Sequence, residues 1–303
     1  MTRQFKYLVL LMITFATGLK SQYYFYNDKY YHSPLLVETG ISIGGMNCLT
    51  DLGGRSDEGS LFVKDINWNQ THPCMGLYVG VLFDQLLGVR LEANFGKISG
   101  ADKVLKRDQP SAKDRYQRNL HFQSTISELA LLVEFFPFSL LNKESYPLIA
   151  PYLIGGIGFF KFNPQAELGG QWINLHPLHT EGQGFSEYSD KAEYRLTQVE
   201  FPIGFGLRYE LSALWNLRLE LIYRFLNTDY LDDVSTKYIN PASFHANLHP
   251  IQAMNAQMLA DRSYELQPAL YRSDGDIRGN PEKKDGYFSC SLQVGFTINR
   301  KRR

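Results

Sequence analysis

The sequence has few cysteines, no net charge and few long apolar runs. Its 303 residues include three cysteines, and 31 basic side chains balance 31 acidic ones. Three cysteines cannot form a disulfide framework, and a neutral chain lacks the basic excess that is typical of nucleic-acid-binding proteins. Beyond the N-terminal segment no apolar run reaches the roughly eighteen residues of a membrane-spanning helix. The sequence therefore predicts neither a nucleic-acid binder nor a helical membrane protein.

The N-terminus has the order of a secretory signal peptide. Basic Arg3 and Lys6 precede an apolar stretch from Tyr7 to Ala16, and a short polar stretch ends near Ser21. The apolar stretch is too short to span a bilayer as a helix, and the order of basic, apolar and polar residues predicts cleavage after Ser21. We therefore expect a signal peptide over 1–21, a periplasmic N-terminal segment over 22–34, a folded domain over 35–299 and a basic tail over 300–303.

The three cysteines leave one question open. Cys48 and Cys74 flank the same predicted loop, so in an oxidising compartment they either form a disulfide or remain free. Cys290 lies on an apolar face of a predicted strand, and we expect it to be unpaired.

Strict alternation of apolar and other residues is the dominant pattern. From Tyr287 to Ile298 every second residue is apolar, and the residues between them are mostly small or polar. Successive side chains of a strand point to opposite faces, whereas a helix would scatter these two sets. The same pattern predicts eight strands, at roughly 35–47, 73–83, 87–96, 120–136, 148–162, 198–209, 216–225 and 287–298.

The connections between these strands alternate between short and long. Turns at 83–87, 139–147 and 211–216 are short, and the connections at roughly 48–72, 98–119, 164–195 and 229–285 are long. Short periplasmic turns and long outer loops are typical of outer-membrane barrels. The sequence thus predicts an all-β fold, an eight-stranded antiparallel up-and-down transmembrane β-barrel with long extracellular loops, located in the outer membrane with both termini in the periplasm.

The second face of the predicted strands contains glycines and charges of both signs. A soluble sandwich or lipocalin-like barrel also alternates, but its polar face meets water. Opposite charges on the inner face suit a narrow lumen in which they pair, because an eight-stranded barrel is just wide enough for side chains to fill it. The candidate interior ion-pair residues are Arg90, Glu92, Glu128, Glu134, Glu200, Arg208, Arg218, Glu220 and Arg224, and Glu38 lies on the same face.

Two local features qualify this pattern. Pro202 falls inside a predicted strand, and because proline cannot donate to a β-ladder we expect a β-bulge there. In the longest loop, Ile251, Met254 and Met258 have helical spacing, which indicates a short amphipathic helix between Pro250 and Arg262. Such a helix would pack over the barrel mouth or against a partner.

Several phrases together resemble one family. They are Ala150-Pro-Tyr-Leu-Ile-Gly-Gly-Ile-Gly-Phe-Phe-Lys-Phe-Asn-Pro164, His179-Thr-Glu-Gly-Gln-Gly184, Thr228-Asp-Tyr-Leu-Asp-Asp-Val-Ser235 and Arg278-Gly-Asn-Pro281. The third phrase is the most specific and contains the motif residues Thr228, Asp229, Tyr230, Asp232 and Asp233. From about Val37 to Ile298 the chain resembles the Bacteroidetes outer-membrane barrel PorG of the type IX protein secretion system.

The resemblance implies a structural component of a protein transport machine. Members of that family are thought to contact the periplasmic ring formed by the PorK lipoprotein and PorN, while cargo leaves through a separate, larger barrel. The aromatic segment from Tyr23 to Tyr31 is a candidate contact for the ring or an interfacial anchor. The expected partners are outer-membrane lipid, PorK and PorN. The alternative is a small OmpX-like barrel that acts as a surface binder or adhesin.

The residues point away from catalysis. His121, His176, His179, His245 and His249 lie on or near predicted outer loops, but no Gly-x-Ser-x-Gly, His-Glu-x-x-His or Cys-x-x-Cys motif accompanies them. We expect no enzyme activity, small-molecule substrate or cofactor. The carboxylates near Asp229 do not have the spacing of a calcium loop, so we expect no metal and assign them to closing the rim through Arg or Lys partners.

Overall fold

The computed structural model describes residues 34–52, 68–104, 110–140, 148–269 and 271–299. The expected signal peptide, the aromatic segment from Tyr23 to Tyr31 and the basic tail lie outside these residues. No helix of the described residues is long and apolar enough to cross a membrane.

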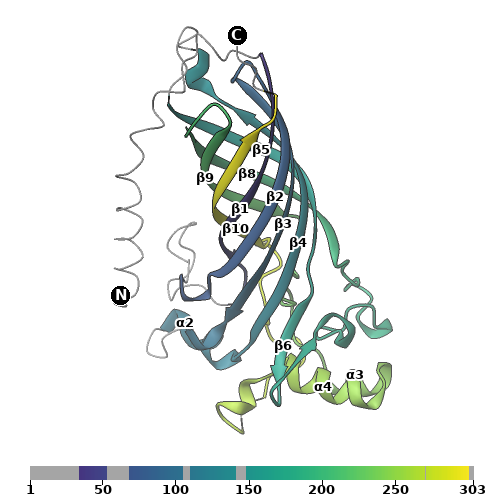
Figure 1. Ribbon diagram of the computed structural model, residues 1–303. Helices are drawn as coiled ribbons and strands as arrows, with labels where there is room; N and C mark the ends of the chain where they lie inside the picture. Colours follow the sequence, from purple (N-terminus) through teal and green to yellow (C-terminus); the bar gives the residue numbers. More distant parts are fainter. Residues whose placement is uncertain (1–33, 53–67, 105–109, 141–147, 270, 300–303) are drawn as a thin grey trace.

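Eight antiparallel strands form a closed barrel (Figure 1). Each strand pairs with the next along the chain, and the first strand pairs with the last, which closes the cylinder. The predicted eight-stranded up-and-down β-barrel is therefore confirmed. The barrel strands are β1 (Leu35–Leu49), β2 (His72–Phe83), β3 (Leu87–Ala101), β4 (His121–Phe135), β5 (Ile149–Lys161), β8 (Thr197–Glu210), β9 (Trp215–Leu226) and β10 (Gly286–Thr297).

Short turns and long loops lie at opposite ends of the barrel (Figure 1). The described residues of the connections at 84–86, 136–148 and 211–214 form the turn end, where the amide of Ile298 also donates to the carbonyl oxygen of Val37. In the tightest of them, Asp84 and Gln85 have positive φ values. The described residues of the connections at 50–71, 102–120, 162–196 and 227–285 form the loop end. Short and long connections thus alternate as predicted.

The loop end contains the remaining elements except η4 (Pro137–Leu140), a 3-10 helix that lies at the turn end. A hairpin of β6 (Pro164–Leu168) and β7 (Gln171–Asn174) extends the sheet beyond β4. The helices are α2 (Pro110–Arg118), α3 (Pro241–Asn247) and α4 (Pro250–Ala260). Six short 3-10 helices complete the described residues: η2 (Trp68–Gln70), η3 (Asp102–Val104), η4 (Pro137–Leu140), η5 (His176–Leu178), η6 (Ser186–Tyr188) and η7 (Ser263–Glu265).

The helix predicted in the longest loop is present, but it buries a different face. Proline occupies the first position of α4, where no backbone N–H is needed. The residues with the predicted apolar spacing, Ile251, Met254 and Met258, are 67%, 58% and 39% exposed. Small residues of the opposite face pack inward instead, and together with α3 and β6 they form a core over the loop end: Ala166, Leu175, Leu178, Phe185, Ile239, Phe244, Ala253, Ala256, Leu259 and Ala260.

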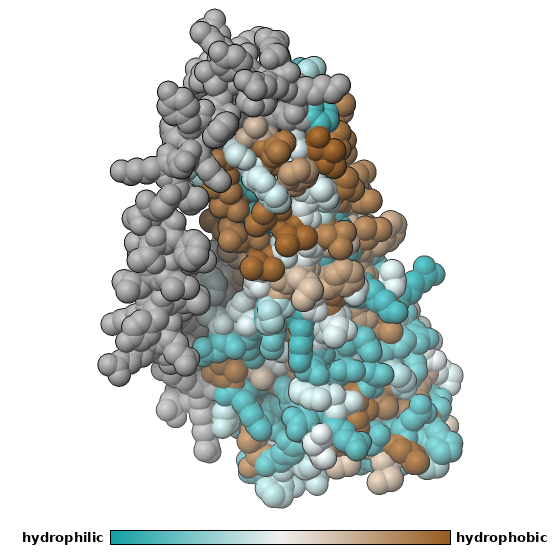
Figure 2. Space-filling model, viewed as in Figure 1, coloured by the Kyte–Doolittle hydropathy of each residue, from teal (hydrophilic) through white to brown (hydrophobic). Residues whose placement is uncertain are grey.

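The outer surface of the barrel is an apolar belt (Figure 2). On β2 it runs from Met75 to Phe83 and on β3 from Leu87 to Phe95, where every second residue is apolar and most of these residues are exposed. Nine residues of a tilted strand rise roughly 25 Å, which matches the apolar band of outer-membrane barrels. Such a surface would aggregate in water. The chain therefore has the fold of a transmembrane barrel of the outer-membrane type.

On three neighbouring strands, β3, β4 and β5, the outward residue that follows the apolar belt towards the loop end is polar. The next outward residue towards the loop end after Phe95 is Lys97, and the one after Phe159 is Lys161. On β4 the exposed residue beyond Leu129 is Ser127. The strands therefore continue beyond the belt at the loop end.

The interior has three layers. At the turn end, a core closes the barrel with Leu36, Leu82, Ala130, Leu132, Phe136, Tyr152, Ile154 and Ile222. Towards the loop end, a second core contains Met46, Leu52, Ile98, Leu120, Phe122, Ile126, Phe160, Phe162, Tyr194, Leu226, Leu231, Val234 and Tyr287. Between the two lies a layer of charged side chains.

Pro202 does not produce the expected β-bulge, so that prediction is wrong. Its pairing with Arg224 of β9 keeps the register of the whole β8–β9 ladder. Towards β5 the register is also unchanged, but pairing is interrupted between Gly155–Ile203 and Gly158–Glu200. A gap in the ladder accommodates the missing N–H without an inserted residue.

The cysteines are free thiols in the described structure. Cys74 is paired with Gly44 of β1, four positions along that strand from Cys48. Four residues of a strand span about 13 Å, beyond the reach of a disulfide. Cys290 is exposed on the apolar outer face, as expected.

Candidate functional site: a filled lumen and a buried loop clasp

The central layer of the lumen is a network of buried ion pairs. Arg90 of β3 lies 2.8 Å from Glu92, 2.9 Å from Glu134 and 2.7 Å from Glu220. These side chains come from three strands and are almost fully buried. Inward positions of β3, β4 and β9 thus meet at the barrel axis because the alternation of each strand turns them to the same side.

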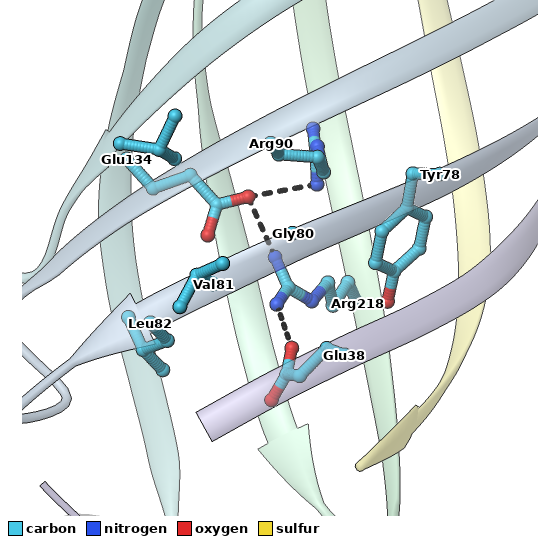
Figure 3. Close-up of a pocket in the computed structure, with 9 residues that line it drawn as sticks. Glu38, Tyr78, Gly80, Val81, Leu82, Arg90, Glu134 and Arg218 are labelled. Atoms are coloured by element: carbon cyan, nitrogen blue, oxygen red, sulfur yellow. Dashed lines mark hydrogen bonds and ion pairs between the residues drawn. The ribbon is translucent and has the colours of Figure 1, made fainter. Parts of the chain in front are cut away.

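Two further arginines, Arg218 and Arg208, extend this network towards the turn end, and Figure 3 shows Arg218 between Glu134 and Glu38. Arg218 lies 2.7 Å from Glu134 and also binds Glu38, which in turn binds Arg208. Arg208 also lies 3.1 Å from Glu210.

The last arginine of the lumen organises the layer towards the loop end. Arg224 lies 2.9 Å from Glu128. The Tyr287 hydroxyl donates to Glu128 at 2.9 Å and also contacts Glu200. All nine residues selected from the sequence therefore lie in the lumen, and Glu200 contacts a tyrosine rather than an arginine.

These side chains fill the barrel. The cavity among Glu38, Tyr78, Arg90, Glu134 and Arg218 has a volume of about 10 Å³, about the space that one water molecule needs. Apolar cores lie on both sides of this charged layer. The network links β1, β3, β4, β8, β9 and β10 across the lumen.

At the loop end, three of the family-like phrases meet in one buried cluster. The Glu181 carboxylate accepts hydrogen bonds from the backbone amides of Ser235 and Thr236, both at 2.9 Å, and from the Thr236 hydroxyl at 2.6 Å. Arg278 donates to Glu181 at 2.9 Å and to the Asp233 carbonyl oxygen at 2.5 Å. We call Glu181, Tyr230, Asp233, Ser235, Thr236 and Arg278 the loop clasp.

The loop clasp joins segments that are distant in sequence. The Tyr230 hydroxyl donates to Glu181 at 3.3 Å, and its ring stacks on Tyr194 with centroids 4.9 Å apart. The Asp233 carboxylate accepts from the hydroxyls of Thr180 at 2.5 Å and Tyr194 at 2.7 Å. Thus the 162–196 loop and both ends of the 227–285 loop form one unit.

A family model decides the relationship of this chain. A domain of unknown function (DUF6089) matches residues 25–247. The chain belongs to the DUF6089 family. The matched region includes Glu181 and the Thr228–Ser235 phrase, whereas Arg278 and β10 lie beyond it. No curated protein matches the chain.

Solved outer-membrane proteins resemble this DUF6089 chain at low identity. Ail, the attachment invasion locus protein of Yersinia pestis, is 9% identical, with 87% of this chain and 97% of Ail covered and a TM-score of 0.35. Neisserial surface protein A is 9% identical, with coverages of 88% and 98% and a TM-score of 0.38. A major outer membrane protein from Thermus thermophilus is 11% identical, with coverages of 88% and 100% and a TM-score of 0.38. The fold assignment of the DUF6089 chain rests on its own strand pairing and apolar belt.

We had expected the motif carboxylates of the DUF6089 chain to close the rim by pairing with Arg or Lys side chains, and the structure shows other partners. Asp232 accepts from the amides of Leu52 and Val234, both at 2.9 Å. The Thr228 hydroxyl accepts from the Tyr230 amide at 3.1 Å. Backbone amides and hydroxyls are therefore the main partners, and Arg278 contacts Asp233 through its carbonyl oxygen.

Three buried aspartates and the half-buried Asp51 gather beside the loop clasp. Asp285 accepts from the Leu231 amide at 2.9 Å, and Asp51 accepts from the Asn280 amide at 2.6 Å. With Asp229 and Asp232 they oppose one another's ionisation. Burial and Asp51 raise the pKa of Asp232, and burial, Asp232 and Asp229 raise that of Asp285.

Among these four aspartates, Asp229 has the fewest hydrogen bonds to its buried carboxylate. Both of its carboxylate oxygens are buried without a hydrogen-bond partner among the described residues. Burial raises its pKa to about 7, with the Ser235 hydroxyl opposing the shift and Asp51 adding to it. This carboxyl therefore binds its proton near neutral pH.

Sequence reasoning missed Asp51, Asp102, Arg118 and Asp285. Arg118 lies 2.9 Å from Asp102, donates to the Asp51 carbonyl oxygen at 2.8 Å and also contacts the Arg278 carbonyl oxygen. In the sequence these are isolated charges in polar loops, which usually face solvent. No local signal distinguishes them from the surface.

The histidines are spread over the loop end. His176 contacts the carbonyl oxygen of Tyr194 at 2.8 Å, and His245 contacts Gln257 at 3.0 Å. His72, which sequence reasoning did not select, lies 2.7 Å from the Ser99 hydroxyl. No carboxylate of the described residues is hydrogen-bonded to His72, so His72 and Ser99 do not form a Ser-His-acid triad. Among the described residues, no group of three or more His, Cys, Asp or Glu side chains is arranged to hold a metal ion.

Proposed function

We propose that this DUF6089 chain is a non-enzymatic outer-membrane component of the type IX protein secretion machinery. The observation that carries the proposal is the loop clasp. Three separate phrases that resemble PorG, around Glu181, Asp233 and Arg278, meet in one buried cluster. A filled lumen is consistent with an accessory barrel beside a separate conduit.

The proposed orientation places the loop end outside the cell and the turn end in the periplasm. Short periplasmic turns and long outer loops are the usual arrangement. The turn end offers exposed Phe138 and Leu140 on η4. We propose that this rim and the preceding segment 22–34 contact the ring of PorK and PorN.

The proposal includes no chemical step and no cofactor. Each arginine of the lumen forms an ion pair with a carboxylate, and the clasp carboxylates of Glu181 and Asp233 accept hydrogen bonds from backbone amides and hydroxyls. Such groups are neutralised in the resting fold. Their chemistry supports a structural role.

Deletion of this chain in its native bacterium tests the proposal. We expect proteins with the C-terminal sorting domain to accumulate in the periplasm, and we expect tagged wild-type chain to co-purify PorK and PorN. Restoration by wild-type chain, but not by a Phe138→Ser/Leu140→Ser variant that reaches the outer membrane, would assign the contact to the turn end. Normal secretion in the deletion strain would refute the role.

One observation favours a second function. Ile251, Met254 and Met258 form an exposed stripe on α4 at the loop end, and apolar residues at this spacing are typical of helices that dock against a partner. A surface-binding or adhesin-type barrel would use this stripe. Replacing the three residues with serine would then abolish binding to cells or proteins outside while secretion stays normal.

A further inference from the structure

Two lysines lie on the outer face of the barrel directly beyond the apolar belt. Lys97 of β3 is paired with Thr125 of β4, and Lys161 of β5 is paired with Ser127 of β4. Thr125 and Ser127 are successive exposed positions on the outer face. Two ammonium groups therefore flank two hydroxyls, and we call these four residues the boundary patch.

The boundary patch lies at one level around the barrel. The outward residues one step nearer the turn end are Phe95, Leu129 and Phe159, which are 48%, 51% and 60% exposed. Neighbouring strands are about 4.8 Å apart, so β3 and β5 are separated by about 10 Å. Two lysine side chains can reach a common anion across that distance. An acyl chain attached to the anion would lie on the three apolar residues below.

The surroundings of the boundary patch fit an interface between lipid and water. The indole ring of Trp172 lies 5.7 Å from the Lys97 ammonium and is 45% exposed. Tryptophan is enriched where headgroups meet hydrocarbon. The salt bridges among the described residues involve arginine and histidine only. No carboxylate of the described residues therefore neutralises Lys97 or Lys161.

We propose that the boundary patch binds the phosphate of an outer-leaflet lipid headgroup, with the lipid's acyl chains against the belt. Lysine ammonium groups bind phosphate oxygens as point charges, and serine and threonine hydroxyls add donors. The continuous apolar surface below selects a lipid over free phosphate. This proposal rests on the outer-membrane placement proposed above, with the loop end outside.

Lipid binding to the purified full chain in detergent tests the proposal. The probes are lipid A with two phosphates, the same lipid after removal of both phosphates, and inorganic phosphate, with dissociation constants measured by native mass spectrometry. The test variant is Lys97→Gln/Lys161→Gln. The control is Lys237→Gln/Lys283→Gln, which removes the same charge from exposed positions of the 227–285 loop.

We expect the test variant to raise the dissociation constant for phosphorylated lipid A at least tenfold, and the control to change it less than twofold. Unchanged binding by the test variant, or equal binding of the dephosphorylated lipid, would overturn the proposal. Displacement of lipid A by millimolar phosphate would show an anion site without lipid selectivity. Fractionation of the wild-type chain away from the outer membrane would instead refute the placement, and normal secretion in the deletion strain would refute the secretion role alone.

Discussion

Arg278 and Glu181 are 97 positions apart in sequence, and the guanidinium of one donates to the carboxylate of the other at 2.9 Å in a fully buried site. The pair joins two loops that leave different strands of the barrel. Since each partner neutralises the other away from water, the two loops depend on one another for their conformation.

Replacing Glu181 with glutamine will loosen the whole loop end. Arg278 would remain buried without its charge partner, which costs about 3–5 kcal/mol. We expect faster proteolysis of the 162–196 and 227–285 loops while the barrel keeps its resistance to SDS at room temperature. The exposed Glu282→Gln serves as control, and equal protease resistance of both variants would contradict the clasp.

The loop end will be more stable in mild acid than in mild alkali. The pKa of Asp229 is raised to about 7 in the fold, from an unfolded value near 4. The folded state therefore binds more protons than the unfolded state between about pH 4 and pH 7, so stability falls as pH rises through that window. We expect the protection of loop amides from hydrogen exchange, expressed relative to the intrinsic exchange rate at each pH, to be at least tenfold lower at pH 8 than at pH 5. Asp229→Asn should reduce this difference without abolishing it, because Asp232, Asp233 and Asp285 also have raised pKa values. An unchanged pH profile in that variant would assign the whole difference to those other groups.

Arg224 and Glu128 will behave as a coupled pair in the lumen. Arg224→Met leaves Glu128 without a basic side chain and should reduce the free energy of unfolding in lipid vesicles by about 3–5 kcal/mol. Adding Glu128→Gln should recover part of that loss, because the buried charge is removed. A double variant as unstable as the sum of both single variants would exclude coupling. The exposed Arg195→Met controls for loss of charge.

The position of the apolar belt predicts that an arginine substitution destabilises the barrel at Leu131 but not at Thr125, although both residues face outward on β4. Leu131 lies in the apolar belt and Thr125 lies beyond it. Leu131→Arg should reduce the free energy of unfolding in lipid by about 2–4 kcal/mol. Thr125→Arg should change it by less than about 1 kcal/mol, and equal losses would contradict the placement of the belt.

Gly206 on the inner face provides a test of lumen packing, with Gly155 on the outer face as its control. A side chain at Gly206 would overlap the Tyr152 ring, whereas a Cβ at Gly155 meets no atom within 4 Å. Gly206→Ala should reduce stability in vesicles by about 1–3 kcal/mol, and Gly155→Ala should be neutral. A neutral Gly206→Ala would show that Tyr152 can move aside.

The strands were predictable because alternation is a local property. Each inward and outward set, such as that from Leu87 to Phe95, follows from the sequence of one strand alone. Which arginine meets which glutamate was not predictable, because it depends on the register around the closed barrel. Arg90 finds Glu220 from a position 130 residues away.

Two other features could not be predicted from the sequence: which face of α4 is buried, and how the sheet accommodates Pro202. The larger residues Ile251 and Met254 suggested the buried face, but the small Ala253 and Ala256 allow closer packing against neighbouring elements. At Pro202 the sequence shows only a missing donor. Whether a strand responds with an inserted residue or a gap depends on both of its neighbours.

The ladder between β1 and β10 determines when this chain can fold. It runs from the Glu38–Thr297 pair to the Leu49–Gly286 pair, so the first strand obtains one of its two neighbours only after the last strand has been synthesised. Until then β1 has an unpaired edge, which is prone to wrong pairing. Folding must therefore follow completion of the chain, and any factor that accompanies it to the membrane has to protect that edge from the first strand to the last.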